Sequence, residues 1–495
     1  MIAPRILAID QGTTNSKAVL IDSDGRIVAR ASVPRTSGYP RPGWAEQSAA
    51  DIWQSVLDVI AGIVEQAGAE GIAGLAISNQ RETLAVWNGE TGAPVGPCIL
   101  WQCRRTADAA ESLRAAGHDP MVSDRTGLSI NPLFPASKLG WVMENVPEAA
   151  GLAAAGRLRA GTIDTWLLWN LTAGERFATD HSNASRTQLF DTARLVWDAG
   201  LCELFGAPIS ALPEPCPSDS IFGHTRGVPG LPDGLPILAM LGDSHAALYG
   251  HGVRAPGVVK ATYGTGSSLM TLVPGRTPSS HGLSGTIAWS RGAEVAYAIE
   301  GNITISAQAA AYVAGLLGVG DARDLSELAQ SVGNSNGVTV VPAFSGLGAP
   351  HWDDTAKGAI AGLTLGCTPA HVARATFEAI AMQIADVFFA MERDVGSGLD
   401  GLLADGGASA NGFLMQLQAD LLDRTVTRRD VAEIGALGVA TMAFESLGCD
   451  ASALTGDRTS EAFTPAIPAT ERAEIHARWR NAVDRVRSSR GDSGR

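Results

Sequence analysis

The feature that most constrains the fold is an apolar strand that turns sharply on glycine and threonine into a second strand, and it occurs twice. Residues 5–22, "RILAIDQGTTNSKAVLID", predict two strands joined by a turn at 12–14. Residues 257–273, "GVVKATYGTGSSLMTLV", repeat this plan around Gly-Thr-Gly. A plan that recurs half a chain later indicates an internal duplication.

The segments after each turn follow a similar order. In the first half we expect a third strand over 26–35, a helix over 48–68 with Ser48 as its N-cap, and a buried strand over 71–78. In the second half we expect a strand over 293–301, an Ala-rich helix over 304–318 and a strand over 337–344. The sequence therefore predicts an α/β protein with two duplicated lobes, 1–249 and 250–495, around a central cleft. Such lobes suit an actin-like (ribonuclease H-like) ATP clamp.

Charge and cysteine usage restrict the partners. The 495-residue chain has 51 acidic and 37 basic residues, a net charge of −14, which argues against nucleic acid as a principal partner. Its apolar runs are too short for a membrane span. The six cysteines form no CxxC pair, so we expect reduced, mostly buried thiols in a cytoplasmic protein.

Asp10 and the turn after it are candidate phosphate ligands. Asp10 ends the first strand, and Thr13, Thr14, Asn15 and Lys17 follow. Hydroxyls and turn N–H groups would bind phosphate oxygens, and Asp10 would orient Mg²⁺ through water. The alternative is an ordinary Asx turn at a strand end. The turn alone does not say whether ATP drives a shape change, as in a chaperone, or supplies a phosphoryl group.

Two segments are candidates for binding an acceptor with hydroxyl groups. Arg81 and Glu82 follow the strand over 71–78, at the carboxyl end where open α/β sheets bind ligands. They could donate to and accept from neighbouring hydroxyls, although a surface ion pair is equally consistent. Trp101 could wall a polyol pocket or simply lie in the core.

Asp243 follows an apolar run and a glycine, just before the second half. An acid at this junction is a candidate general base for a hydroxyl, and it could also cap a helix over 244–250. We expect His245 on the surface of that helix. Farther on, the double glycine Gly406-Gly407 could let the backbone approach a nucleotide beside a helix, or could be a tight connection.

Motifs along nearly the whole chain together resemble those of the FGGY carbohydrate kinases, and within them the glycerol kinases. They include "DQGTTNSKAV", "ISNQRET", "WQCRRTAD", "LFPASKLGWVMEN", "SNASRTQLF", "GDSHAAL", "TYGTG", "GAIAGLTLGCTPAHVARATFE" and "DGGASANGFLMQ".

The resemblance implies transfer of the γ-phosphoryl group of Mg-ATP to a primary hydroxyl of a small polyol or sugar. By position it makes Asp243 the catalytic base and, with Asp10, a metal ligand. It places Arg81, Glu82 and Trp101 in the acceptor pocket. Phosphate and nucleotide contacts would come from Thr13, Thr14, Asn15, Lys17, Thr265, Gly407 and Asn411. It also implies a homo-oligomer, a dimer or tetramer, with no nucleic-acid or membrane partner.

Departures from the glycerol kinase pattern concern the acceptor. Leu133 replaces a tyrosine, Ser244 a glutamine and Ser268 an aromatic residue, while Ala307 and Ala311 alter the adenine side. Glycerol is the first expectation, and a C4–C5 polyol or ketose of the erythritol, erythrulose or xylulose type is the alternative. A heat-shock-type ATPase without a small-molecule acceptor is the rival from another class, but it would require a peptide-binding domain after the ATPase.

Overall fold

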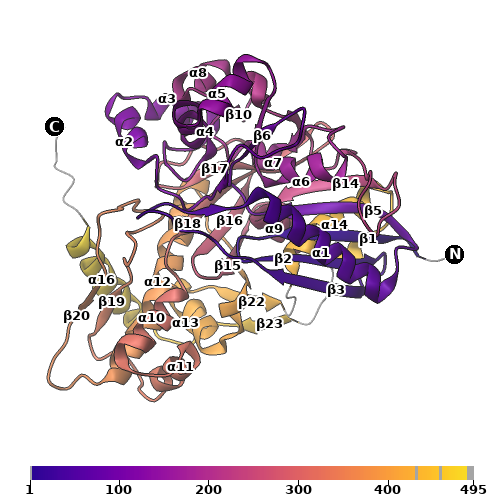
Figure 1. The fold of residues 1–495 in the computed structure, drawn as a ribbon. Coiled ribbons are helices and arrows are strands. Elements are labelled where there is room, and N and C mark those ends of the chain that lie inside the picture. Colours follow the sequence, from indigo (N-terminus) through magenta and orange to yellow (C-terminus); the bar gives the residue numbers. More distant parts are fainter. Residues whose placement is uncertain (1–2, 430–432, 456–459, 488–495) are drawn as a thin grey trace.

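Two β-sheets, one in each half of the chain, organise the protein (Figure 1). The computed structural model describes residues 3–429, 433–455 and 460–487. The N-terminal sheet has the order β13-β14-β5-β1-β2-β3. Its strands are β1 (Arg5–Gln11), β2 (Asn15–Asp22), β3 (Ile27–Pro34), β5 (Ile72–Asn79), β13 (Gly223–His224) and β14 (Pro236–Gly242).

The C-terminal sheet has the order β17-β18-β16-β15-β21-β22-β23. Its strands are β15 (Val258–Tyr263), β16 (Ser267–Val273), β17 (Ser284–Arg291), β18 (Glu294–Ile303), β21 (Gly401–Asp405), β22 (Thr425–Arg429) and β23 (Ser460–Phe463). In both lobes an antiparallel three-strand unit continues through its first strand into two parallel strands: β3-β2-β1-β5-β14 matches β18-β16-β15-β21-β22. The expected α/β architecture with two lobes is confirmed.

One expected strand belongs elsewhere. Residues 339–341 do form β19 (Thr339–Val341), but among the described residues it pairs with β20 (Ala359–Ala361) alone, in a separate small sheet. The counterpart of β5 is β21, which comes after the long helix α12 (Pro369–Val395). The strand expected over 337–344 is confirmed, but its place in the repeated order differs, because an apolar run predicts a strand without saying which strand it pairs with.

Alternate side chains of β1 enter two different cores. Leu7 and Ile9 pack with α1 (Ala49–Ala67) and α6 (Ile163–Leu171) on the outer face. Ile6 and Ala8 join an inner cluster with α9 (Asp243–Gly250) and α14 (Ile434–Ser446). This two-residue period buries β1 on both faces, as expected of a central strand, here between antiparallel β2 and parallel β5, whose sheet is covered on both sides. Ser48 caps α1 by accepting from the Asp51 N–H.

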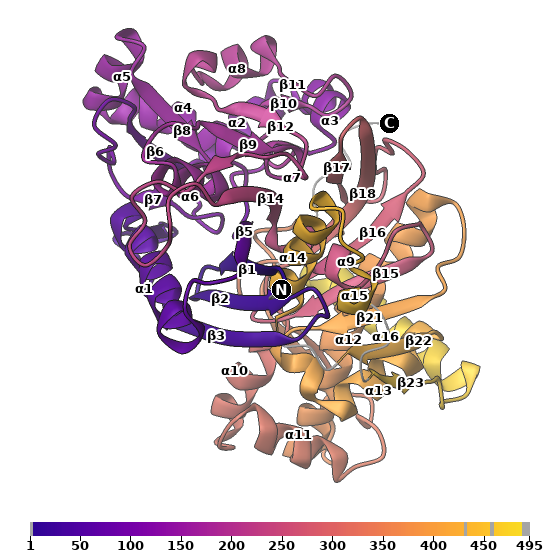
Figure 2. The same cartoon turned by 90° about the vertical axis from the view of Figure 1, so that its right-hand side faces the viewer.

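Helices α9 and α14 lie side by side between the two sheets (Figures 1 and 2). Although α14 belongs to the C-terminal half of the chain, it packs on β1, β5 and β14 of the N-terminal sheet. Glycines permit the close approach: a Cβ on Gly438 would lie 1.8 Å from the Ala246 carbonyl oxygen, and one on Gly250 2.4 Å from that of Ile434. The two lobes therefore share one apolar core.

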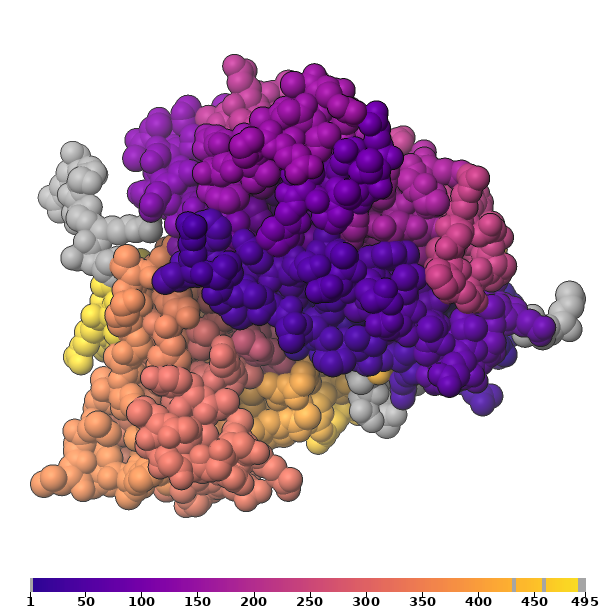
Figure 3. Space-filling view, viewed as in Figure 1, coloured from indigo at the N-terminus to yellow at the C-terminus, as the bar shows by residue number. Residues whose placement is uncertain are grey.

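Further helices and strands complete each lobe. In Figure 3 the N-terminal lobe forms the upper indigo-to-magenta body and the C-terminal lobe the lower salmon-to-yellow body. The N-terminal lobe adds α2 (Ala107–Ala115), α3 (Asp119–Thr126), α4 (Pro135–Asn145), α5 (Pro147–Ala154), α7 (His181–Ala184), α8 (Ala199–Phe205), β4 (Glu46–Gln47), β6 (Ala85–Asn88), β7 (Cys98–Ile99), β8 (Leu158–Gly161), β9 (Ala178–Asp180), β10 (Phe190–Asp191), β11 (Val196–Trp197) and β12 (Glu214–Cys216). The C-terminal lobe adds α10 (Gln308–Leu317), α11 (Ala322–Gln330), α13 (Gly412–Leu422), α15 (Ser452–Thr455) and α16 (Ala469–Val486). Within the described ranges no helix is both long and apolar enough to span a bilayer. The cysteines are all free thiols, four of them buried.

Candidate active site

The carboxylate of Asp10 lies at the end of β1, where the Ser78 hydroxyl donates to its Oδ1 at 2.9 Å. Burial raises the pKa of Asp10, and the charge of nearby Asp243 raises it further. A divalent cation would stabilise two carboxyl groups placed in this way, and carboxylate oxygens are ligands that Mg²⁺ accepts. Asp10 and Asp243 are therefore candidate magnesium ligands, while no cluster of three or more His, Cys, Asp or Glu side chains suited to a metal lies within the described residues.

The turn after β1 is closed by the Gly12 N–H, which donates to the Asn15 carbonyl at 2.9 Å. Thr14 is exposed there, whereas the Thr13 hydroxyl is already engaged: it donates to Gln80 Oε1 at 3.0 Å and accepts from Trp101 Nε1 at 3.1 Å. Lys17 lies opposite Asp10 in the β1–β2 pair. Thr13 therefore links the turn that carries the candidate phosphate ligands to Trp101, a candidate acceptor residue.

Arg81 connects the two lobes through ion pairs to Asp243 and to Glu300. Its Nε donates to Asp243 Oδ1 at 2.9 Å, and its NH1 lies 2.7 Å from Glu300 of β18. Arg81 and Glu82 are both buried, so the surface ion pair that the sequence left open is excluded. Asp243 is the first residue of α9, after the N-cap Gly242, and its side chain is 46% exposed. A half-exposed carboxylate held by a buried arginine can accept a proton from a bound hydroxyl.

Glu82 and Glu300 are bridged by a second buried arginine that sequence reasoning did not single out. Arg186 Nε donates to Glu82 Oε1 at 2.6 Å, and its NH2 lies 2.8 Å from Glu300. Burial alone would raise the pKa of Glu300, but the guanidinium groups of Arg186 and Arg81 hold it well below its usual range. The only sequence indication was a charged residue inside each of the segments "SNASRTQLF" and "AIEGN". This network fixes the carboxylate of Glu82.

Ser244 and Ser268 come from opposite lobes and hydrogen-bond each other at 2.8 Å. The Ser268 hydroxyl donates to Glu300 Oε1 at 2.8 Å, and buried Lys260 donates to Ser244 Oγ at 2.8 Å. Leu133 is half-buried in the loop before α4. Ser244 and Ser268, which stand where the glycerol kinase pattern has larger side chains, thus form a chain of hydroxyl groups that ends at Glu300.

His245 corrects one expectation. It is fully buried rather than on the helix surface, and its Nε2 hydrogen-bonds Thr286 Oγ1 at 3.1 Å. Burial lowers its pKa well below the ordinary value, and the charge of Arg81 lowers it further. The surface expectation was wrong because α9 is enclosed between two sheets and has no solvent face at that residue.

The candidate nucleotide residues lie on the C-terminal lobe. Thr265 is exposed in the turn between β15 and β16. Gly406 has a φ of 87°, and a Cβ there would lie 2.5 Å from the Tyr263 carbonyl oxygen, whereas a Cβ on Gly407 would meet no atom within 4 Å. Asn411 caps α13, and its amide donates to Ser326 at 3.0 Å. Gly406 thus serves the tight turn and Gly407 presents open backbone.

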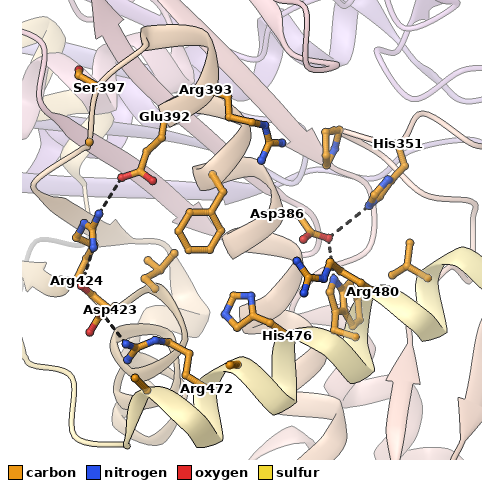
Figure 4. Close-up of a pocket in the computed structure, with 18 of the residues that line it drawn as sticks. His351, Asp386, Glu392, Arg393, Ser397, Asp423, Arg424, Arg472, His476 and Arg480 are labelled. Carbon is orange, nitrogen blue, oxygen red and sulfur yellow. Dashed lines mark hydrogen bonds and ion pairs between the residues drawn. The ribbon is translucent and has the colours of Figure 1, made fainter.

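A large surface groove lies away from these residues, between α12 and α16 (Figure 4). Its volume is 1080 Å³, and its wall includes Asp386, which accepts from Trp479, and Arg424, which pairs with Glu392. None of the candidate catalytic or binding residues lines it. The volume of this groove therefore does not mark it as the candidate active site.

Comparison with protein families assigns both halves of the chain to one family. Residues 5–250 match the N-terminal domain and residues 259–447 the C-terminal domain of the FGGY family of carbohydrate kinases. The chain is 45% identical to an apulose kinase of Pectobacterium atrosepticum, covering 98% of this chain and 99% of that one. It is also 45% identical to a glycerol kinase of Symbiobacterium thermophilum, covering 97% and 98%.

A solved structure agrees with this assignment. Plasmodium falciparum glycerol kinase with ADP superposes with a TM-score of 0.91 at 30% identity, covering 98% of both chains. This likeness confirms the expected actin-like fold of two lobes and, with the family match, the use of ATP.

Proposed function

We propose, since the chain belongs to the FGGY family of carbohydrate kinases, that it transfers the γ-phosphoryl group of ATP to a primary hydroxyl of a four- or five-carbon polyol or ketose. Glycerol would be a poorer acceptor. The observation that carries the choice of acceptor is the pair of hydroxyls at Ser244 and Ser268, where glycerol kinases have a glutamine and an aromatic residue.

Asp243 would act as the general base. Its carboxylate takes the proton of the acceptor hydroxyl while the hydroxyl oxygen forms a bond to the γ-phosphorus, and the bond from that phosphorus to the leaving ADP oxygen breaks. The hydrogen bond from Arg81 leaves the second carboxylate oxygen of Asp243 for the proton. A magnesium ion held by Asp10 and Asp243 would neutralise phosphate charge.

The acceptor would lie between Trp101 and the Arg81–Glu82 pair. The indole N–H is fixed by Thr13, so the ring can serve as a rigid wall against the apolar face of a polyol. Arg81 would donate to acceptor hydroxyls and Glu82 would accept from them.

The preference for a longer acceptor follows from the smaller side chains at Ser244 and Ser268. A three-carbon acceptor leaves space beside Ser268 unfilled and forfeits dispersion contacts there. One or two further carbons would fill it and bring hydroxyls within reach of Ser244 and Ser268. Such a difference is worth about 1–3 kcal/mol, so glycerol would still react. The equal identity to an apulose kinase and to a glycerol kinase is compatible with an acceptor other than glycerol.

The test is a panel of acceptors assayed with Mg-ATP by coupled ADP release: glycerol, erythritol, erythrulose, xylulose, ribulose and apulose. We expect kcat/KM for at least one longer acceptor to equal or exceed that for glycerol. Ser268→Phe should shift preference toward glycerol, while Ser268→Ala, which removes the bond to Glu300 without adding bulk, should not. A hundredfold preference of the wild type for glycerol over every longer acceptor would refute the proposal.

The family also leads us to propose a cytoplasmic homo-oligomer, a dimer or a tetramer. Light scattering coupled to gel filtration tests the assembly, and a mass equal to one 51.2 kDa chain would exclude it.

A further inference from the structure

A buried lysine, Lys138 of α4, joins the three loops that carry the candidate acceptor residues. Its Nζ donates to the carbonyl oxygens of Leu133 at 2.7 Å, Glu82 at 3.3 Å and Trp101 at 3.4 Å. The side chain has no exposed area. These carbonyls belong to the same three residues that resemblance to the kinases placed in the acceptor pocket, although their segments lie far apart in the sequence.

The ammonium group of Lys138 has the right number of donors to bind three carbonyl oxygens at once. An ammonium group has three N–H donors and no acceptor, and here three carbonyls from three segments receive them. Within the described residues, Lys138 has no carboxylate partner. The carboxylate of Glu82, whose carbonyl Lys138 binds, accepts instead from Arg186 Nε at 2.6 Å.

Keeping a charge at this position carries a free-energy penalty. Burial lowers the pKa of Lys138 to about 7, against the opposing effects of the Cys103 thiol and the Glu82 carboxylate, while Arg105 lowers it further. The hydrogen bonds to the three carbonyls offset that penalty, because an apolar side chain of similar length would leave those acceptors unpaired. The buried cation therefore ties three separate backbone segments to one point.

Glu82 gives a reason for the contact. Its φ is 58°, in the left-handed region that non-glycine residues seldom adopt. Such a backbone persists only where its surroundings hold it, and Lys138 binds its carbonyl while Arg186 binds its carboxylate. Both anchors fix where the Glu82 carboxylate stands relative to Trp101.

We propose that Lys138 is a positioning residue for the acceptor: its ammonium group holds the backbones of Glu82, Trp101 and Leu133 at fixed separation, so acceptor binding depends on it and nucleotide binding does not. The inference rests on the acceptor pocket assigned under the proposed function. Asp10, Thr265 and Gly407, on the phosphate and nucleotide side, have no hydrogen bond to Lys138 within the described residues.

The test replaces Lys138 by Met, which keeps the length and removes every donor, and by Gln, which keeps two donors without charge. The control is Lys357→Met, which removes the charge of an exposed lysine. Steady-state kinetics with the best wild-type acceptor, ADP affinity by calorimetry and thermal unfolding are measured for each. We expect Lys138→Met to raise the acceptor KM at least tenfold, with the Kd for ADP within twofold, and to lower the Tm because three buried carbonyls lose their donor. Lys138→Gln should fall between Met and wild type.

An acceptor KM within twofold of wild type in Lys138→Met would overturn the proposal, as would a parallel rise of the acceptor KM and the Kd for ADP. If Lys138→Met fails to fold, the same two comparisons apply to Lys138→Gln. A wild type that prefers glycerol would refute the proposed acceptor size, yet would leave the effect of Lys138 measurable with glycerol itself. The two proposals can therefore fail separately.

Discussion

Replacing Gly438 by alanine should separate the two helices that join the lobes. The added Cβ would lie 1.8 Å from the Ala246 carbonyl oxygen and 2.8 Å from the Gly250 nitrogen. Both atoms belong to the backbone of α9, so no side-chain rotation relieves the overlap. Helix α14 must move away from α9 by more than about 1 Å to restore an ordinary contact.

The cost follows from two opposing effects. Overpacking of a well-packed core costs about 1–3 kcal/mol, and a rigid backbone neighbour puts this position at the upper end. Alanine recovers about 1 kcal/mol of helix propensity. We therefore expect a net loss of about 2 kcal/mol and a fall in Tm of about 4–8 °C. Because a Cβ on Gly435 would lie 3.8 Å from Asp10 Oδ1, moving α14 should also lower kcat.

The assay compares thermal unfolding and kcat of Gly438→Ala with those of Gly315→Ala. Gly315 lies in α10, where an added Cβ meets no atom within 4 Å, so its replacement should stabilise the protein by up to about 1 kcal/mol. If Gly438→Ala matched this control in Tm and kept full turnover, the tight α9–α14 contact would not be what holds the lobes and the site together.

Three further changes test other parts of the molecule. Asp243→Asn should lower kcat about 10²–10⁴-fold with ATP affinity retained, and turnover within tenfold of wild type would remove it from the role of base. Arg104 and Asp354 pair across the lobes at 2.5 Å but are half exposed, so Asp354→Ala should change the acceptor KM less than about fivefold, and a change that persists in 1 M salt would contradict an ionic origin. Burial raises the pKa of Asp164 to about 7, so between about pH 4 and 7 the folded carboxyl keeps a proton that the unfolded chain releases, and stability should fall as pH rises. Asp164→Asn should flatten that fall in Tm, and an unchanged slope would mean that Asp164 ionises normally.

The sequence by itself determined the local units and the residues at their ends. Alternating apolar residues predicted β1 and β2, and Ser48 marked the start of α1. Asp10, Arg81 and Asp243 could be proposed because each follows an apolar strand, and carboxyl ends of strands meet at one edge of a sheet. Strand period, helix caps and turn residues depend on a few neighbouring positions, so the sequence alone is enough to predict them.

Only the tertiary structure decided which distant groups meet. The sequence could not place β19 outside the main sheet, bury His245, or pair Arg186 with Glu82 and Glu300. Nor could it bring Lys138 to three separate carbonyls. A buried polar group needs hydrogen-bond partners, but its own sequence does not name them. These partners are chosen by the packing of α4, α9 and α14, which brings together segments up to several hundred residues apart and so places the candidate acceptor residues.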